Sequence, residues 1–123
     1  MGNPLVSVIT PSFNSEKFIL ETIQSVQNQT YQNWEMIIVD DGSSDSTKRI
    51  IQNLMKNDLR IQFFPLEKNV GPAKARNIGI NEAKGKYITF LDADDIWFTD
   101  FIANSIKTIH ETGIHFVFSS YGR

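Results

Sequence analysis

The fold is decided by residues 5–39, which read LVSVITPSFNSEKFILETIQSVQNQTYQNWEMIIV. This stretch holds two short β-branched runs, Leu5–Thr10 and Trp34–Val39, separated by a segment with apolar residues at helical spacing. Short runs of this kind predict strands, and the spacing between them predicts an amphipathic helix. Its expected inward face consists of Phe18, Ile19, Thr22, Ile23 and Val26. Ser15 is the expected N-cap, so the stretch predicts a strand, a helix and a second strand.

The rest of the chain repeats this alternation. Further strands are predicted at residues 60–64, 87–91 and 114–118, and further helices at 47–57, from Pro72 to a stop at Gly85, and from a cap at Thr99 to Gly113. The helix that begins at Pro72 has a small-residue inward face, which favours close packing on a sheet: Ala75, Ile78, Gly79 and Ala83. Strands that alternate with helices predict right-handed crossovers. We therefore expect one α/β domain over residues 1–123, with a Rossmann-like, mostly parallel sheet and helices on both faces.

Composition excludes several classes of protein. A chain of 123 residues with 41% hydrophobic residues is long enough to fold around one core. It contains no cysteine, which excludes disulfide scaffolds, thiolate metal sites and cysteine nucleophiles. Its formal net charge of -2 has the wrong sign for a nucleic-acid partner. With no long apolar run and no signal-peptide pattern, the sequence predicts a soluble, cytoplasmic protein.

Three polar segments follow predicted strands: residues 11–14, 40–45 and 92–95. Ligands of open parallel sheets bind at the carboxyl ends of the strands, so these segments are the candidate site. They contain five aspartates: Asp40, Asp41, Asp92, Asp94 and Asp95. Because such carboxylates repel one another, we expect a cation or hydrogen-bond donors among them.

Asp92 and Asp94 form a hard-oxygen pair directly after a predicted strand. Mg²⁺ or Mn²⁺ is the natural guest, because such ions are held by one or two carboxylates together with substrate phosphates and water. The alternative is that these residues cap the next helix or lie in a solvated loop.

Asp41 and Phe13 offer groups that recognise a nucleoside. A carboxylate after the second strand accepts a hydrogen bond from an imide N–H or a ribose hydroxyl, and an aromatic ring after the first stacks on a base. The alternatives are an aspartate turn into the next helix, with Ser44 or Asp45 as its cap, and core packing of Phe13. We expect Asp41 to be functional and Asp45 to be structural.

Lys74 and Arg76 lie in the first turns of the helix after Gly71, where a cation and a helix N-terminus favour a diphosphate. Arg76 is equally suited to pair with one of the aspartates. His110 is expected to favour a helix end, and His115 to be a strand residue, because neither has a partner at metal-ligand spacing.

Four ordered segments resemble the family 2 glycosyltransferases, nucleotide-sugar transferases of the GT-A fold. The matching segments are VSVITPSFN (6–14), IVDDGSSDST (38–47), NVGPAKARNIG (69–79) and GKYITFLDADD (85–95). Together they span most of the chain, and their order and spacing are more specific than any one of them.

The resemblance implies a role for each matching residue. Pro11 and Phe13 would hold and stack a uracil, Asp41 would accept from its imide, and Asp92 and Asp94 would be the DxD pair. The implied nucleotide-sugar-binding residues are Pro11, Ser12, Phe13, Asn14, Asp41, Lys74, Arg76, Asp92 and Ala93, with Asp94 and Asp92 as ligands of Mn²⁺ or Mg²⁺. The implied reaction is metal-dependent, inverting transfer of a sugar from a nucleotide-diphosphate donor, with UDP favoured, to a hydroxyl acceptor, as in polysaccharide biosynthesis.

The resemblance also implies a missing part. The family's general base lies well downstream of the DxD pair, so we expect it beyond Arg123 and assign no catalytic residue within this chain. We expect the chain to be the N-terminal nucleotide-binding part of a longer domain, which acts on a saccharide or lipid-linked acceptor at the cytoplasmic face of the membrane. An uncovered sheet edge would favour self-association.

Two competing classes place their aspartates elsewhere. Receiver-type phosphoacceptors and phosphohydrolases with an aspartate nucleophile need an acidic residue after the first strand, where this chain has Thr10-Pro11-Ser12. A module that binds a nucleotide without turnover remains open, because the general base is not in the sequence.

Overall fold

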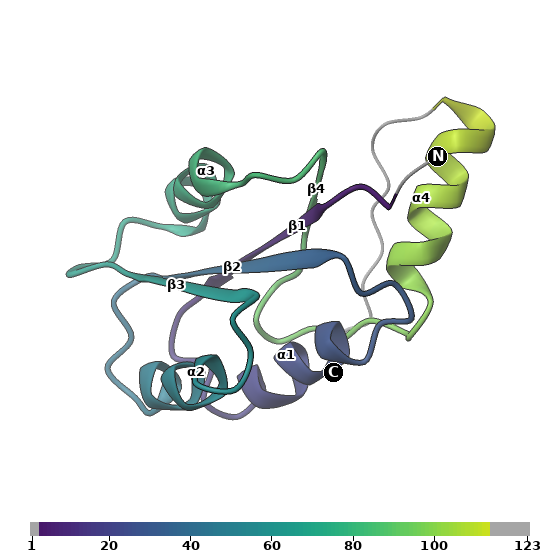
Figure 1. Ribbon diagram of the computed structural model, residues 1–123. Coiled ribbons are helices and arrows are strands. Elements are labelled where there is room, and N and C mark those ends of the chain that lie inside the picture. The colour runs from purple at the N-terminus through teal and green to yellow at the C-terminus, as the bar shows by residue number, and fades with distance from the viewer. Residues whose placement is uncertain (1–2, 114–123) are drawn as a thin grey trace.

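Four parallel strands form one sheet in the computed structural model, which describes residues 3–113. The elements are β1 (Val6–Ser12), α1 (Ile19–Gln27), β2 (Trp34–Asp40), α2 (Thr47–Met55), β3 (Ile61–Pro65), α3 (Pro72–Glu82), β4 (Tyr87–Phe90) and α4 (Phe101–Thr112). The strands lie in the order β3-β2-β1-β4 (Figure 1). The predicted α/β class is therefore confirmed. The strand predicted at residues 114–118, and His115 within it, lie outside the described residues.

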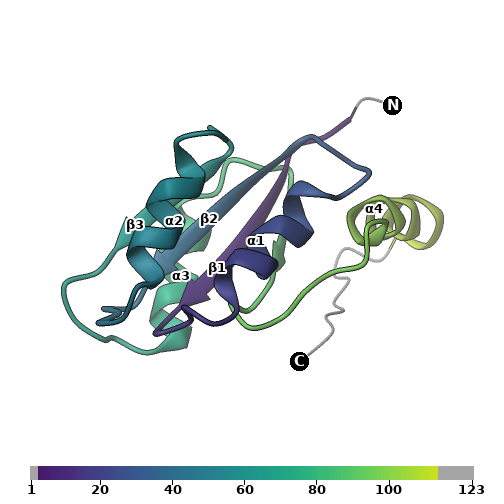
Figure 2. The ribbon, with the colours of Figure 1, turned by 90° about the horizontal axis from the view of Figure 1, so that it is seen from below.

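The central strand β2 carries the core on both of its faces, and each of its residues is buried. Trp34, Met36 and Ile38 join an apolar cluster with α1, α2 and α4. Ile37 and Val39 point the other way, into a cluster with α3. Figures 1 and 2 show α1 and α2 side by side on one face of the sheet and α3 on the other. The predicted cover of helices on both faces is confirmed.

The helix α3 approaches the sheet closely because its inward face carries small residues. Ala75 and Gly79 are its buried positions. A Cβ atom on Gly79 would lie 2.5 Å from Cγ2 of Ile9, a fully buried side chain of β1. The predicted close packing is thus confirmed at Gly79.

Substituting Gly79→Ala should lower the free energy of unfolding by about 1 kcal/mol, because overpacking a full core costs roughly 1–3 kcal/mol and exceeds the gain in helix propensity. Urea denaturation followed by circular dichroism measures the change. Asn81→Ala, at an exposed position of the same helix, is the matched control and should not destabilise. An alanine at position 79 that stabilises the protein would contradict the close contact.

The strand β1 continues past the end that the sequence predicts. We expect it to stop at Thr10, but it runs to Ser12 through Pro11. Leu91 N–H donates to the carbonyl of Ile9, so the odd-numbered residues of β1 face β4. β4 ends at Phe90, so among residues 3–113 no strand lies beside Pro11 on that side. Proline has no N–H to donate, and at this position no strand needs one.

Three helices begin differently from their predicted caps. At α2 the N-cap position belongs to Ser46, so the prediction of Ser44 or Asp45 as the cap is wrong. α1 starts at Ile19, and Ser15 contributes its carbonyl oxygen, which accepts the N–H groups of Phe18 and Ile19, rather than a side-chain cap. The Ser15 hydroxyl donates instead to the carbonyl of Phe13. Phe18 is consequently exposed and does not belong to the inward face. At α4 the N-cap position belongs to Asp100, so the prediction of Thr99 is wrong, while the predicted end at Gly113, with φ 73°, is confirmed.

Gly85 does not end α3, which closes at Glu82 with Ala83 as its C-cap. A Cβ atom on Gly85 would lie 2.6 Å from the backbone nitrogen of Ser7. This glycine is therefore needed where the chain enters β4 against β1. On its other side β4 pairs with no strand among residues 3–113, and self-association along that edge stays a prediction.

Candidate functional site

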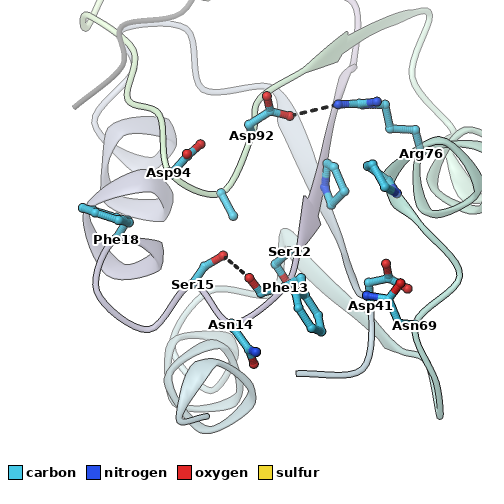
Figure 3. Close-up of a pocket in the computed structure, with 13 residues that line it drawn as sticks. Ser12, Phe13, Asn14, Ser15, Phe18, Asp41, Asn69, Arg76, Asp92 and Asp94 are labelled. Carbon is cyan, nitrogen blue, oxygen red and sulfur yellow. Dashed lines mark hydrogen bonds and ion pairs between the residues drawn. The ribbon is translucent and has the colours of Figure 1, made fainter. Parts of the chain in front are cut away.

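The three polar segments meet at the carboxyl edge of the sheet around one pocket of about 430 Å³. Figure 3 shows side chains around this space from β1 and the loop after it, from the segments after β2 and β4, and from α3. The lining residues are Pro11, Ser12, Phe13, Asn14, Ser15, Phe18, Asp41, Asn69, Pro72, Arg76, Asp92, Ala93 and Asp94. Of the nucleotide-sugar-binding and metal-binding residues that the family resemblance implies, all but Lys74 line the pocket, and Lys74 is exposed.

The loop after β1 presents Phe13 to the pocket. This side chain is 48% exposed, which excludes the core-packing alternative. The backbone turns at Asn14, a non-glycine residue with φ 46°. Asn14 is held from both sides, because its N–H donates to the Ser43 hydroxyl at 2.8 Å and its side-chain oxygen accepts from Ser44 N–H at 2.9 Å. The loops after β1 and β2 therefore form one connected wall.

Asp40 does not line the pocket but is hydrogen-bonded within that wall. Its carboxylate is fully buried and accepts from the Ser12 hydroxyl at 3.0 Å. It also accepts from the backbone N–H and the hydroxyl of Ser43, at 2.9 Å and 2.6 Å. A buried carboxyl group is stable only when hydrogen-bond donors surround it. Because the donors to Asp40 come from the end of β1 and from the segment after β2, Asp40 links these two strand ends.

Asp41 lines the pocket and also holds the loop that precedes α3. Its carboxylate, in a residue only 4% exposed, accepts from the N–H groups of Val70 at 2.7 Å and Gly71 at 3.0 Å. This clamp brings Asn69 and Pro72 to the pocket wall. The sequence reasoning did not assign these two residues to the site, although both lie in the quoted segment 69–79.

The acidic segment after β4 gathers three carboxylates. One oxygen from each of Asp92, Asp94 and Asp95 lies within 4.8 Å of the others. Arg76 on α3 pairs with Asp92 at 3.3 Å, which confirms the predicted alternative of an ion pair. Both side chains are more than a third exposed, so this pair contributes little to stability. With three carboxylates and one guanidinium among its lining residues, the pocket favours a cation.

Asp45 is structural, as expected. It accepts from the N–H and hydroxyl of Thr47 at the start of α2, and from the N–H of Glu16 beyond β1. Burial opposes ionisation of Asp45, but these hydrogen bonds outweigh it and lower the pKa of the carboxyl below its ordinary 3.8. The ionised form therefore stabilises the folded state.

Substituting Asp45→Ala should lower the free energy of unfolding by about 1 kcal/mol at pH 7. Because the folded pKa is depressed, the wild-type advantage is complete above pH 3.8 and is lost as the pH falls through the folded value. Urea denaturation at pH 7 and at lower pH measures this. Glu16→Ala keeps the backbone N–H and should show neither effect; a deficit of Asp45→Ala that persists undiminished in acid would contradict the assignment.

A parallel sheet with an acidic pocket at its carboxyl edge, one wall of which carries an exposed aromatic ring, is the arrangement of a ligand-binding α/β domain. The chain belongs to glycosyl transferase family 2, whose model matches residues 7–123. The predicted family is thus confirmed.

Curated relatives resemble nearly the whole chain. It is 46% identical over 118 residues to TuaG of Bacillus subtilis, a glycosyltransferase assigned to teichuronic acid biosynthesis. It is 40% identical over 121 residues to the Escherichia coli protein WfgD, named UDP-Glc:alpha-D-GlcNAc-diphosphoundecaprenol beta-1,3-glucosyltransferase. The matches cover 96% and 98% of this chain but only 47% of each relative. The chain therefore spans about half the length of these relatives.

Two solved structures share the fold and hold donors. TarS of S. aureus in complex with UDP-GlcNAc is 34% identical with a TM-score of 0.81, over 88% of this chain and 32% of TarS. The mannosyltransferase PcManGT of Pyrobaculum calidifontis, in complex with GDP-Man and Mn²⁺, is 25% identical with a TM-score of 0.85. That match covers 93% of this chain and 34% of PcManGT.

Among residues 3–113, none of the helices has the length and apolar character needed to cross a membrane.

Proposed function

We propose that this protein binds a nucleotide-diphosphate sugar, with UDP as the nucleotide, together with Mn²⁺ or Mg²⁺. Inverting transfer of the donor sugar to a hydroxyl of a saccharide or lipid-linked acceptor would then need the part of the relatives that this chain does not span. The observation that carries the proposal is that a single pocket holds Phe13 and Asp41 on one wall and Asp92 and Asp94 on another. A ligand with an aromatic base and a diphosphate matches both walls.

The base-binding wall supports a pyrimidine with an imide. Phe13 exposes its ring to the pocket, where it stacks on a base. Asp41 keeps its carboxylate at the pocket while it holds the adjacent loop, and a carboxylate oxygen has a second lone pair for an imide N–H. UDP is favoured over GDP because the donor named for WfgD and the donor bound to TarS are both UDP-sugars.

The acidic wall suits a hard divalent cation. Carboxylate oxygens from Asp92 and Asp94 are near enough to one another to serve one ion, and such ions take substrate phosphate oxygens as further ligands. The bound ion would neutralise charge on the departing nucleoside diphosphate as a Lewis acid. Mn²⁺ in the PcManGT complex supports this choice. Arg76, beside Asp92, would add a positive charge near the diphosphate.

Acceptor binding and proton removal are proposed for the part of the relatives that this chain does not span. The carboxylates that line the pocket within residues 3–113 are Asp41, Asp92 and Asp94, and the proposal assigns each of them to donor binding. None is therefore left as the general base that deprotonates an acceptor hydroxyl. We propose that the chain alone binds donor without transferring its sugar. The diphosphoundecaprenol in the name of WfgD supports an acceptor presented at the cytoplasmic face of the membrane.

Substituting Asp94→Asn should remove the metal-dependent part of UDP binding, because a neutral amide is a poor ligand for a hard cation. Calorimetric titration of UDP in Mn²⁺ and then in EDTA measures that part, which should fall by roughly ten-fold or more. Asp100→Asn is the matched control, since it makes the same charge change at an exposed residue outside the pocket. UDP affinity in Mn²⁺ that is equal in wild type and Asp94→Asn would exclude Asp94 from the metal site.

Substituting Asp41→Asn should weaken UDP binding by about 2 kcal/mol, or roughly thirty-fold in affinity, because a charged hydrogen-bond acceptor is lost. Binding of inorganic pyrophosphate with Mn²⁺ should change little, because pyrophosphate has no base. An equal loss for both ligands would assign Asp41 to the loop alone. Equal affinity of the wild-type protein for UDP and pyrophosphate would contradict base recognition altogether.

A further inference from the structure

The side chain of Thr22, on α1, is hydrogen-bonded to the acidic segment. Its hydroxyl lies 3.0 Å from the carbonyl oxygen of Ala93 and 2.7 Å from that of Asp95. These are the carbonyl groups on either side of Asp94 in the sequence. Thr22 itself is fully buried. One hydroxyl from a distant helix thus holds the backbone on both flanks of the residue predicted to bind the metal.

A threonine at this point is explained by the loop rather than by the core. The other buried positions of α1 are Ile19, Ile23 and Val26, which pack in the apolar cluster. Burying a hydroxyl costs free energy unless it is hydrogen-bonded. Threonine also has a lower helix propensity than unbranched residues, because its side chain is β-branched. The Thr22 hydroxyl has one proton to donate and lies within hydrogen-bond distance of both carbonyl oxygens.

The acidic segment that Thr22 contacts is a turn outside the helices and strands. Residues 91–95 belong to no helix or strand, and Asp95 N–H donates to the carbonyl of Asp92 in a turn. Ala93 is buried, whereas the Asp94 side chain is exposed and faces the pocket. Figure 3 shows Asp94 beside the helix that carries Thr22. The contact with α1 therefore fixes the backbone while the carboxylate stays open.

We propose that Thr22 is a positioning residue for the cation site: it holds the turn 92–95 so that the Asp94 carboxylate stays beside Asp92 at the pocket. The inference rests on the proposed function, since it concerns the same site. Thr22 touches neither the cation nor the nucleotide. It acts by ordering the acidic segment before a metal binds, so that binding costs less conformational entropy.

The hydroxyl can be removed with almost no change in shape by Thr22→Val. Metal-dependent UDP binding should then weaken about ten-fold, as is common when a group that supports a metal ligand is removed. UDP binding in EDTA should change by less than about two-fold, since Phe13 and Asp41 do not depend on Thr22. Thr22→Ser keeps the hydroxyl and should restore most of the metal-dependent binding.

Ser25→Ala is the matched control on the same helix. The Ser25 hydroxyl donates to the carbonyl of Thr22 at 2.7 Å, within α1, and does not reach the acidic segment. Its removal should leave the metal-dependent binding unchanged. Thr22→Ala removes the hydroxyl without the second methyl group, and it replaces Thr22→Val in every measurement if the valine variant does not fold.

Two measurements on the whole chain test the proposal. Electron paramagnetic resonance of free Mn²⁺ reports metal affinity in the presence of UDP, and amide hydrogen exchange reports the order of residues 92–96 without any ligand. We expect both weaker Mn²⁺ binding and faster exchange in Thr22→Val, and neither in Thr22→Ser or Ser25→Ala. A Thr22→Val protein with wild-type Mn²⁺ affinity would overturn the positioning role, even if its thermal stability falls.

The proposed function fails in a different way. If the wild-type protein binds UDP equally in Mn²⁺ and EDTA, the cation site itself is refuted, and the role of Thr22 toward a metal falls with it. If the wild type depends on Mn²⁺ and Thr22→Val depends on it equally, the site stands and only the inference about Thr22 is overturned.

Discussion

The site depends on the buried carboxylate of Asp40, which joins the ends of the two central strands. Ser12 closes β1 and Ser43 follows β2, and both donate to Asp40 in the interior. A buried carboxyl group of this kind is tolerated only while its hydrogen-bond donors stay in place, since removing one leaves a costly unsatisfied group. The loops that carry Phe13 and Asp41 start from this junction, so their positions follow from it.

The two sides of the pocket differ in how their carboxyl groups are satisfied. On the β1 and β2 side, carboxylates accept from backbone N–H groups and hydroxyls, which satisfy them without any cation. On the β4 side, three carboxylates gather with one partly exposed guanidinium beside them. Repulsion among these carboxylates is relieved by a divalent ion, whereas the first wall needs no such ligand to be ordered. The arrangement would keep the proposed base-binding wall apart from the proposed metal site.

Much of this architecture could be predicted from the sequence because hydrophobic period is a local signal. The alternation of strand and helix patterns gave the parallel sheet, and the rule that ligands bind at carboxyl ends selected the loops that line the pocket. The errors at Pro11, Ser15 and Gly85 share one cause. Each residue has a local meaning as a terminator or cap, but its neighbours in space decided its role. The clamp of Asp41 on residues 70 and 71 joins positions about thirty apart, which no local pattern reveals.

The contacts that hold the two sides of the pocket differ in sequence separation, which bears on the order in which they form. Ser12 and Asp40 are 28 positions apart, whereas Thr22 reaches carbonyl groups 71 and 73 positions away. Closing longer loops loses more chain entropy, so distant pairings form later in folding. A chain that leaves the ribosome N-terminus first has completed Phe13 and Asp41 before the acidic segment is synthesised. We therefore expect the contact between Ser12 and Asp40 to form before Thr22 meets the acidic segment, so that the loops after β1 and β2 are in place when that segment packs against α1.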